Sequence, residues 1–401
     1  MTAQRFYRML LCELDQLKNA PMPIITAIIL PVLAWTVIAL TLQQPVIADI
    51  PVTILDLDGS TLSRTIIRQL DATQALQVRE ITAGEATARA SMRNEESSLL
   101  IIFPKNMERD IKRGGSTQCL IHANGAQLLY SKIAYRAAVT TVYGVSAAIQ
   151  MRRFEANGLA PDAALARAMP VSTEIHAPGN SWYDYGFYLV PGMMLAILQM
   201  SVSFSALWFF RGHSDRDAKL ILPPPGMRLG YFAARGLPLL MANVIAVLLL
   251  FLVFFPLAGI GFTGGTPELF LHTLLFVIAC LGMGAFLSAL FGHLVTAAQI
   301  GLIINAPAFV FSGYTFPRWA MPDGIRVFAE FIPLTHLLDG FFPLMIFQRS
   351  SAEGVFPLLL FCALFWGGSL LLVSSPGERL RAWETRLAAA VRTLQESHPK
   401  C

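Results

Sequence analysis

Charged residues are scarce in this chain of 401 residues, and their scarcity is uneven. Asp, Glu, Lys and Arg make up 14% of the sequence, whereas a soluble domain carries about 25%. Five uncharged stretches lie between the charged residues at positions 18 and 49, 184 and 211, 235 and 268, 268 and 318, and 353 and 378. Because a bilayer core needs about 20 apolar residues as helix, these stretches predict membrane spans.

Sequence motifs of enzymes are also missing. None of the six lysines follows a glycine, so the chain has no P-loop for ATP, and neither H-E-x-x-H nor G-x-S-x-G occurs. No basic segment is interleaved with aromatic residues, which excludes nucleic acid as a partner. Of the five cysteines only Cys119 lies in the polar part of the chain, so no disulfide framework is expected there. We therefore expect no catalytic residue and no metal site.

Residues 43–181 differ in kind from the rest, because charged residues mix there with short apolar runs. We predict strands at 51–58, 75–82, 97–104 and 117–124, and helices at 60–72, 84–96, 106–114 and 126–158. Ser60 is the expected cap of the first of these helices. Strands that alternate with helices predict an α/β domain, and this one is large enough to bury its own core.

The N-terminal residues 1–20 predict an amphipathic helix. Apolar residues at positions 6, 10, 14 and 17 share one face of a helix over 4–18, so the helix can lie in the membrane interface. A continuous extension of the first span is the alternative, and Pro21 and Pro23 argue against it.

The rest of the chain predicts an α-helical integral membrane protein with about six transmembrane helices and the α/β domain inserted between spans 1 and 2. Span 1 covers 21–42, and the region 182–375 holds spans 2–6, near 183–210, 236–257, 269–291, 297–311 and 354–373. A cleaved signal peptide is the rival interpretation of span 1, but the apolar run is too long. The segment 312–353 is interrupted by Pro, Gly and charge, which favours short helices that dip into one membrane face.

The distribution of Lys and Arg predicts the orientation. Both residue types gather in 1–20, in the loop 211–235 and in the tail 376–401, and six spans place all three on one side. By the positive-inside rule that side is cytoplasmic, so residues 43–181 are expected to be periplasmic or extracellular.

Several stretches carry a resemblance to a known family. Residues 52–70 contain D-x-D-x-S-x-x-S-R at Asp56 to Arg64, residues 97–114 form a strand ending in Pro and a short helix closing on Gly, and span 2 contains Val190-Pro191-Gly192. Residues 304–341 contain S-G-x-x-x-P-x-x-x-M-P from Ser312 and P-L-T from Pro333. With the order of the segments, these patterns resemble ABC type-2 exporter permeases, most closely the bacterial, drug-efflux-like subgroup with a large domain after span 1. The resemblance covers essentially the whole chain.

The resemblance implies a transport subunit of the bacterial inner membrane that binds no cofactor itself. Its expected partners are an ATP-binding-cassette ATPase, which holds ATP and Mg, a second permease chain (the same or a sister chain), membrane lipid, and a periplasmic adaptor as a further candidate. The expected substrate is hydrophobic or amphipathic. The substrate's identity and the choice between homodimer and heterodimer stay open.

The loop after span 2 departs from the family pattern E-R-x-x-G-T, because the Gly-Thr pair is missing. Its position still makes it the expected contact with the ATPase. The coupling candidates are Asp215, Arg216, Asp217, Lys219, Leu220 and Pro224 in the loop, and Arg5 and Arg8 in the N-terminal helix.

Two further sets of residues are candidates for the transport pathway. The outer gate candidates are Glu330, Pro333, His336 and Asp339. His336 and Asp339 share a helix face. The alternative to a gate is that these polar residues are simply solvated near the outer surface. The pathway-lining candidates are Met193, Met194, Phe204 and Trp208, for which helix packing or lipid contact is the favoured alternative.

Two other function classes remain as alternatives. The first is a non-transporting membrane protein whose external domain acts in secretion or as a surface receptor. The second is an ion-coupled secondary transporter, which would need ionisable groups within the spans and inverted repeats. The sequence shows neither feature.

Overall fold

The structure is a computed structural model that describes residues 3–19, 21–41, 47–171, 185–211, 228–261, 265–291, 293–347 and 354–374. The chain divides into two compact units, a helical unit of residues 1–45 and 178–401 and an α/β unit of residues 46–177.

Among the described residues of the helical unit, six stretches are long and apolar enough to cross a membrane, which confirms the predicted number. They are Pro21–Thr41, Gly186–Phe210, Phe232–Leu257, Thr266–Leu290, Leu294–Phe311 and Val355–Leu372. The helices that form them are α2 (Pro21–Ile24), η1 (Ile25–Ile29), α3 (Leu30–Thr41), α9 (Tyr185–Arg211), α10 (Arg228–Leu249), η4 (Leu250–Phe254), α11 (Phe255–Leu257), α12 (Thr266–Leu290), α13 (Leu294–Asn305), α14 (Ala308–Phe311) and α17 (Val355–Ser374). Both π-helical segments, η1 and η4, end two residues before a proline, whose missing N–H interrupts the regular helical pattern.

The segment before the last span is broken, as predicted. Helix α15 (Asp323–Glu330) and helix α16 (Pro333–Phe347) meet at an angle of 82°. Pro333 opens α16 with no N–H to continue the preceding helix, so the chain turns sharply there.

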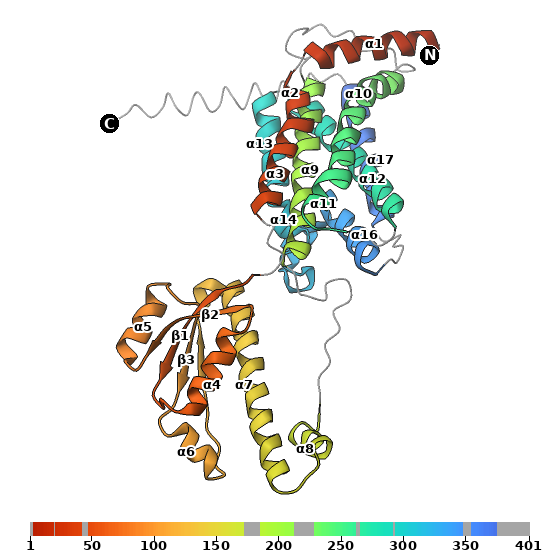
Figure 1. Ribbon diagram of the computed structural model, residues 1–401. Coiled ribbons are helices and arrows are strands. Elements are labelled where there is room, and N and C mark those ends of the chain that lie inside the picture. Colours follow the sequence, from red (N-terminus) through yellow and green to blue (C-terminus); the bar gives the residue numbers. More distant parts are fainter. Residues whose placement is uncertain are drawn as a thin grey trace, which may run out of the picture. The chain divides into compact units, whose positions relative to one another are not determined.

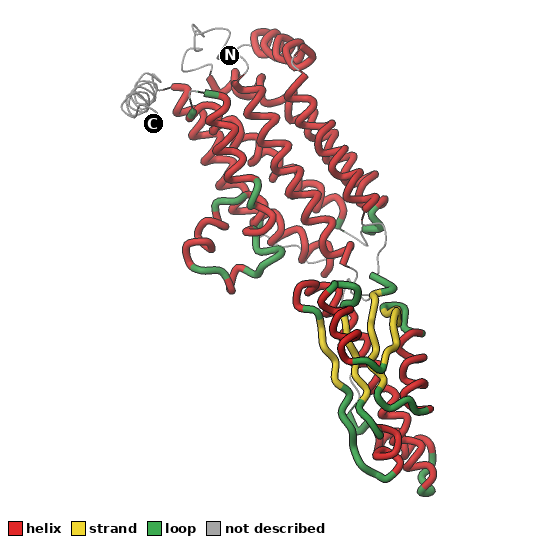
Figure 2. Tube along the Cα trace, turned by 90° about the vertical axis from the view of Figure 1, so that its left-hand side faces the viewer, coloured by secondary structure: helices red, strands yellow, loops and turns green. Residues whose placement is uncertain are grey.

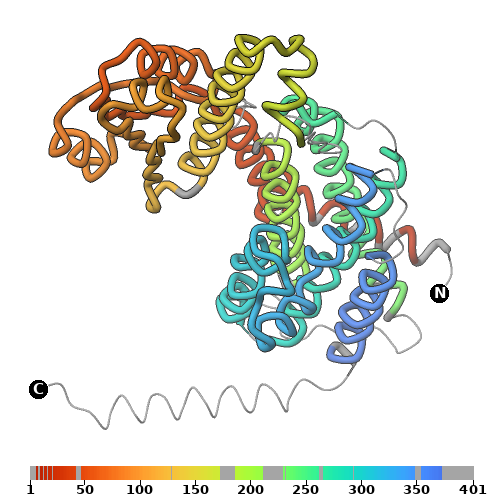
Figure 3. The backbone as a smooth tube through the Cα atoms, turned by 90° about the horizontal axis from the view of Figure 1, so that it is seen from below, coloured from red at the N-terminus to blue at the C-terminus, as the bar shows by residue number. Residues whose placement is uncertain are grey.

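Helix α9 is the central helix of this unit. It packs against α2, α3, α10, α12, α13 and α16. In Figure 3 the yellow-green α9 lies beside the red helix of span 1. The Trp35 indole N–H donates to the carbonyl oxygen of Met194 at 3.0 Å and thereby joins span 1 to α9. Gly284 allows α12 to approach α9, because a Cβ at this position would lie 2.2 Å from the Ser203 carbonyl oxygen.

The α/β unit is built on four strands in the order β2-β1-β3-β4, seen in yellow in Figure 2. The strands are β1 (Ile50–Asp56), β2 (Leu76–Thr82), β3 (Leu99–Phe103) and β4 (Leu120–Ala123). Strand β1 pairs in parallel with β2 and β3, and β4 is antiparallel to β3. The helices are α4 (Thr61–Asp71), α5 (Glu85–Arg93), α6 (Met107–Lys112), α7 (Leu128–Ala156) and α8 (Pro161–Ala168).

The two central strands bury both of their faces, as buried parallel strands do. On β3, Leu99 and Ile101 pack with α4 and α7, whereas Leu100 packs with Ala88 of α5 on the other face. The predicted strands and helices are all present, including the cap of α4, where Ser60 Oγ accepts a hydrogen bond from the Ser63 N–H at 3.1 Å. The prediction missed α8, and the extracytoplasmic location of this unit stays a prediction.

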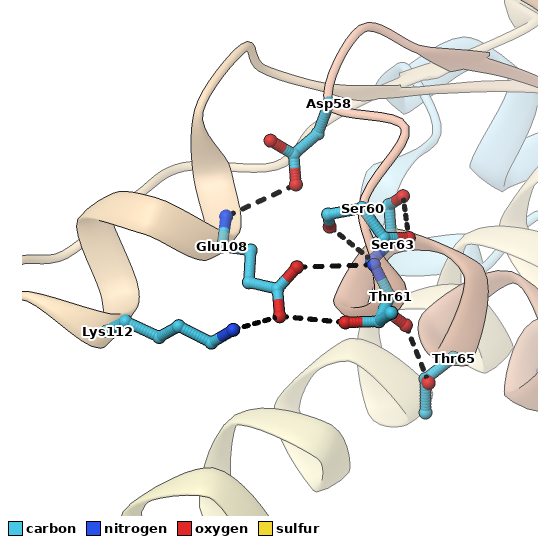
Figure 4. A network of polar contacts seen from close by, with 7 residues as sticks. All are labelled: Asp58, Ser60, Thr61, Ser63, Thr65, Glu108 and Lys112. Carbon is cyan, nitrogen blue, oxygen red and sulfur yellow. Dashed lines mark hydrogen bonds and ion pairs between the residues drawn. The ribbon is translucent and has the colours of Figure 1, made fainter.

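The D-x-D-x-S-x-x-S pattern of the sequence shapes the turn after β1. Asp56 accepts hydrogen bonds from the backbone N–H groups of Asp58 and Gly59 and from the Ser63 hydroxyl. Asp58 in turn accepts from the Glu108 N–H at 3.2 Å, which ties this turn to α6 (Figure 4). These acidic side chains therefore hold the turn and the start of α4 in place.

Glu108 completes the same network. Its carboxylate accepts hydrogen bonds from the Thr61 hydroxyl at 2.8 Å and pairs with Lys112 at 2.7 Å (Figure 4). The hydrogen bonds from Lys112 and Thr61 lower the pKa of Glu108 from its ordinary 4.5 to about 2. The carboxylate thus stays ionised at neutral pH and joins the beginnings of α4 and α6.

Candidate coupling junction and polar cluster

Helix α1 (Ala3–Asn19) lies across one end of the helical bundle (Figure 1). Its predicted apolar face is the face that packs, since Leu17 is buried and Phe6, Leu10 and Leu14 are partly buried, while Tyr7 and Leu11 on other faces are exposed. Glu13 falls on the packed face and is also buried, with 6% of its surface exposed.

Arg235 of α10 is the partner that explains the burial of Glu13. The Nη1 of Arg235 lies 3.8 Å from Oε1 of Glu13, and only 2% of Arg235 is exposed. The Nη2 of Arg235 donates to the carbonyl oxygen of Phe209 at 2.6 Å. The guanidinium also lies over the rings of Phe209 and Phe210, at 5.3 and 5.5 Å from their centroids.

This arrangement joins three helices through one cation, and we call Glu13, Arg235 and Phe209 the coupling junction. The Phe209 carbonyl belongs to the last turn of α9, where carbonyl oxygens lack partners within the helix, and a cation is favourable there. Burial raises the pKa of Glu13, and the charge of Arg235 opposes this effect. Both side chains are therefore buried although their removal from water is energetically unfavourable.

Sequence reasoning missed this junction. It placed Arg235 at the edge of span 3, whereas the helix begins earlier and contains Arg235 within its apolar stretch Phe232–Leu257. The sequence contained one indication of the junction: the charged residue Glu13 lies on the same face of the N-terminal helix as Leu10 and Leu17. The pairing itself spans more than 200 positions and depends on tertiary packing.

The coupling candidates of the sequence are not tested by the structure. Asp215, Arg216, Asp217, Lys219, Leu220 and Pro224 lie outside the described residues. Arg5 and Arg8 belong to α1, but their side chains are not among those described. The junction lies close to them in the sequence, because α9 ends at Arg211 and α10 begins at Arg228.

Three of the outer gate candidates meet around an arginine at the other end of α9. Arg318 contacts Asp339 with its Nη2 at 2.6 Å and Glu330 with its Nη1 at 3.2 Å. The His336 ring nitrogen Nε2 lies 2.9 Å from the Glu330 carbonyl oxygen. We call Arg318, Glu330, His336 and Asp339 the Arg318 cluster. Pro333 is buried at the start of α16 and belongs to the turn rather than to the cluster.

The S-G motif of the sequence supports this cluster. Gly313 has a φ of +89°, and a Cβ there would lie 2.8 Å from Cγ of Arg318. A side chain at position 313 would thus strain the turn and displace Arg318. Arg318 was not predicted as a site residue, although it lies in the same stretch as Gly313; in the sequence Arg326 is nearer to both carboxylates.

A buried network of amides joins three segments between these two ends. The Gln199 Nε2 donates to Oδ1 of Asn305 at 3.0 Å, and the Leu334 N–H donates to Oε1 of Gln199 at 2.8 Å. Gln199, Asn305 and Leu334 come from α9, α13 and α16 respectively. Because amide groups buried in an apolar region are costly unless paired, these bonds hold the three helices in register.

The pathway-lining candidates on α9 have mixed surroundings. Met194 is fully buried in the core, and Met193 is partly buried against it. Phe204 and Trp208 are partly buried. The described residues thus show helix packing for Met194, and a pathway role for all four stays a prediction.

The sequence of the chain is similar to those of known transporter proteins. The model of a family described as ABC-2 family transporter protein matches residues 23–374. "Probable multidrug ABC transporter permease YbhS" of Escherichia coli strain K12 and its counterpart of Escherichia coli O157:H7 are both 26% identical to this chain over 156 residues. The matched region is 38% of this chain and 41% of each relative, so the chain covers about two fifths of the length of these relatives. Since the family match extends from the first span to the last, this chain belongs to the ABC-2 family of transporter proteins as a membrane-spanning permease subunit.

Proposed function

We propose that this chain is the permease of an ATP-driven exporter that moves a hydrophobic or amphipathic substrate out of the cytoplasm or the inner membrane. The family match is the observation that supports this proposal most strongly. The sequence contains no P-loop, so ATP and Mg would bind to a separate ATPase subunit. A second permease chain would complete the pathway, and lipid and a periplasmic adaptor are further partners of the proposed assembly.

The proposed orientation places the coupling junction in the cytoplasmic leaflet and the Arg318 cluster near the outer face. Lysines and arginines of residues 1–20, 211–235 and 376–401 support it. The chain enters the α/β unit after α3 and leaves it before α9. Near the start of α9, Tyr188 stacks on Tyr314, which lies in the turn that leads to Arg318. The start of α9 and the Arg318 cluster are therefore at the same end of the bundle. In this orientation the α/β unit is extracytoplasmic.

The coupling junction would transmit a movement of the ATPase to the membrane spans. A push by the ATPase on α1 would reach Arg235 through Glu13, and Arg235 holds both α10 and the last turn of α9. Since α9 contacts most other spans, a tilt of α9 would move the bundle between inward-facing and outward-facing arrangements. No proton or ion needs to move within the membrane in this scheme.

Site-specific photo-crosslinking in cells tests the proposal. We expect a crosslinker placed at Arg216 to capture a P-loop ATPase, because this position lies in the proposed cytoplasmic contact. A crosslinker at Tyr143 is the matched control, since Tyr143 of α7 is 72% exposed and would lie on the opposite side of the membrane. Capture of the ATPase from Tyr143, or from neither position, would contradict the proposed contact.

A further inference from the structure

A pocket of about 620 Å³ opens beside the Arg318 cluster. Three segments line it: the start of α9, the turn from Ser312 to Trp319, and α16. Its volume lies within the range of about 300–1,000 Å³ that is typical of sites for small organic ligands. The pocket lies within the helical unit, at the end of α9 remote from the coupling junction.

One wall of the pocket is aromatic. The rings of Tyr188 and Tyr314 stack with centroids 4.8 Å apart, and Tyr314 stacks on Phe342 with centroids 4.5 Å apart. Gly192 leaves room for this stack, since a Cβ there would lie 2.4 Å from the Tyr314 ring. Met345 and Ile346 of α16 extend the apolar surface. The wall is thus formed by packed side chains before any ligand binds.

The Arg318 cluster beside the pocket holds two acidic side chains and one arginine. Arg318 and Asp339 line the pocket, and Arg318 divides its guanidinium between Asp339 and Glu330, which is not among the lining residues. One guanidinium is therefore shared by two acidic side chains. The Asp339 Oδ1 accepts from Arg318, and Oδ2 receives no hydrogen bond from the residues that the structure describes.

We propose that this pocket binds a lipophilic organic cation. The positive group lies next to Asp339, where it is attracted by the carboxylate oxygen that does not bind Arg318 and by Glu330, the second acidic side chain of the cluster. The apolar part lies against the aromatic wall. Aromatic faces also attract cations, and this attraction grows when the site excludes water. A lipophilic anion meets the Asp339 carboxylate and an arginine that is already engaged. A lipophilic cation would thus be a substrate of the permease proposed above. Only the transport of the bound cation, and not its binding, rests on that proposed function.

Two probes of the same shape and opposite charge test the charge preference without a mutation. Tetraphenylphosphonium is the cation, and tetraphenylborate is the anion. Equilibrium dialysis against the full chain in detergent, corrected with protein-free micelles, is expected to show saturable binding of tetraphenylphosphonium and none of tetraphenylborate. Saturable binding of both probes with equal affinity, or of neither, would overturn the proposal.

A matched pair of variants locates the site. Asp339→Asn is expected to weaken tetraphenylphosphonium binding at least tenfold. Asp323→Asn is the control, because Asp323 lies nearby in α15, is exposed, pairs only with Arg326 among described residues and does not line the pocket. Equal binding by the Asp339 variant and the unchanged chain would refute this location. If the variant fails to fold, the two-probe comparison still decides the charge preference.

The outcomes separate this inference from the proposed function. Binding is measured on the chain alone, so it does not depend on the ATPase. Recovery of an ATPase partner without cation binding would refute the pocket and leave the permease function standing. Cation binding without any ATPase partner would support the pocket and contradict the exporter.

Discussion

Replacing Arg235 with methionine is expected to destabilise the helical unit by about 3 kcal/mol at pH 7. Removal of one partner from a buried ion pair typically costs about 3–5 kcal/mol, because the other charge is left uncompensated. Glu13 can limit this cost by taking up a proton. For a carboxyl with an ordinary pKa of 4.5, protonation at pH 7 costs about 3 kcal/mol at 1.36 kcal/mol per pH unit.

The stability lost by Arg235→Met should also depend on pH, because Glu13 can take up a proton. Burial already raises the pKa of Glu13 in the folded chain, so folding is favoured when the carboxyl is protonated. The loss caused by Arg235→Met should therefore shrink as the pH falls from 7 toward 4.5. Glu13→Gln should show no such relief, because the arginine that remains cannot lose its proton. Thermal unfolding in detergent at several pH values measures both effects.

The double variant Glu13→Leu with Arg235→Met is the control for the buried pair. Apolar side chains of similar volume often replace a buried ion pair without loss of stability. We expect the double variant to recover most of the stability that either single variant loses. A double variant as unstable as Arg235→Met, or a loss that does not change with pH, would show that the pair is not what joins α1 to the bundle.

Gly284→Ala is the second substitution for which we expect a large effect. The added Cβ would lie 2.2 Å from the Ser203 carbonyl oxygen and 2.7 Å from the Ala206 Cβ. Neither atom can move unless the backbone of α9 moves away from α12. Overpacking of this kind commonly costs about 1–3 kcal/mol, and a backbone clash lies at the upper end. We expect a lower thermal unfolding midpoint and loss of transport.

Gly301→Ala is the matched control, because it adds the same methyl group to a neighbouring helix. The nearest side-chain atom would lie 3.6 Å from the added Cβ, which is an ordinary contact. Alanine is favoured over glycine within a helix by about 1 kcal/mol, so this variant should be as stable as the unchanged chain or more stable. Equal effects of the two substitutions would mean that α9 and α12 are not in close contact at Gly284.

The sequence predicted the secondary structure well for physical reasons that are local. Uncharged stretches located the six spans, and the alternation of apolar runs with polar helices located the strands of the α/β unit. Helix α8 was missed because it is short and follows Gly158, where the predicted long helix ended. The bend before α16 could be predicted because Pro333 interrupts the helix locally.

The contacts that define the candidate sites could be predicted only in part. His336 and Asp339 were selected because they share a helix face, but Arg318, which joins Asp339 to Glu330, was not selected. The pair of Glu13 with Arg235 and the pair of Gln199 with Asn305 join residues far apart in the sequence. Such pairs depend on which helices become neighbours, and the pattern of a single helix does not contain that information.

Affinity purification tests whether this permease works with a separate ATPase. The tagged full chain would be purified in mild detergent, and the proteins that accompany it would be identified by mass spectrometry. We predict recovery of a P-loop ATPase at nearly one copy per permease chain. Clean recovery of the chain without any ATPase would show that it does not work as an ATP-driven permease.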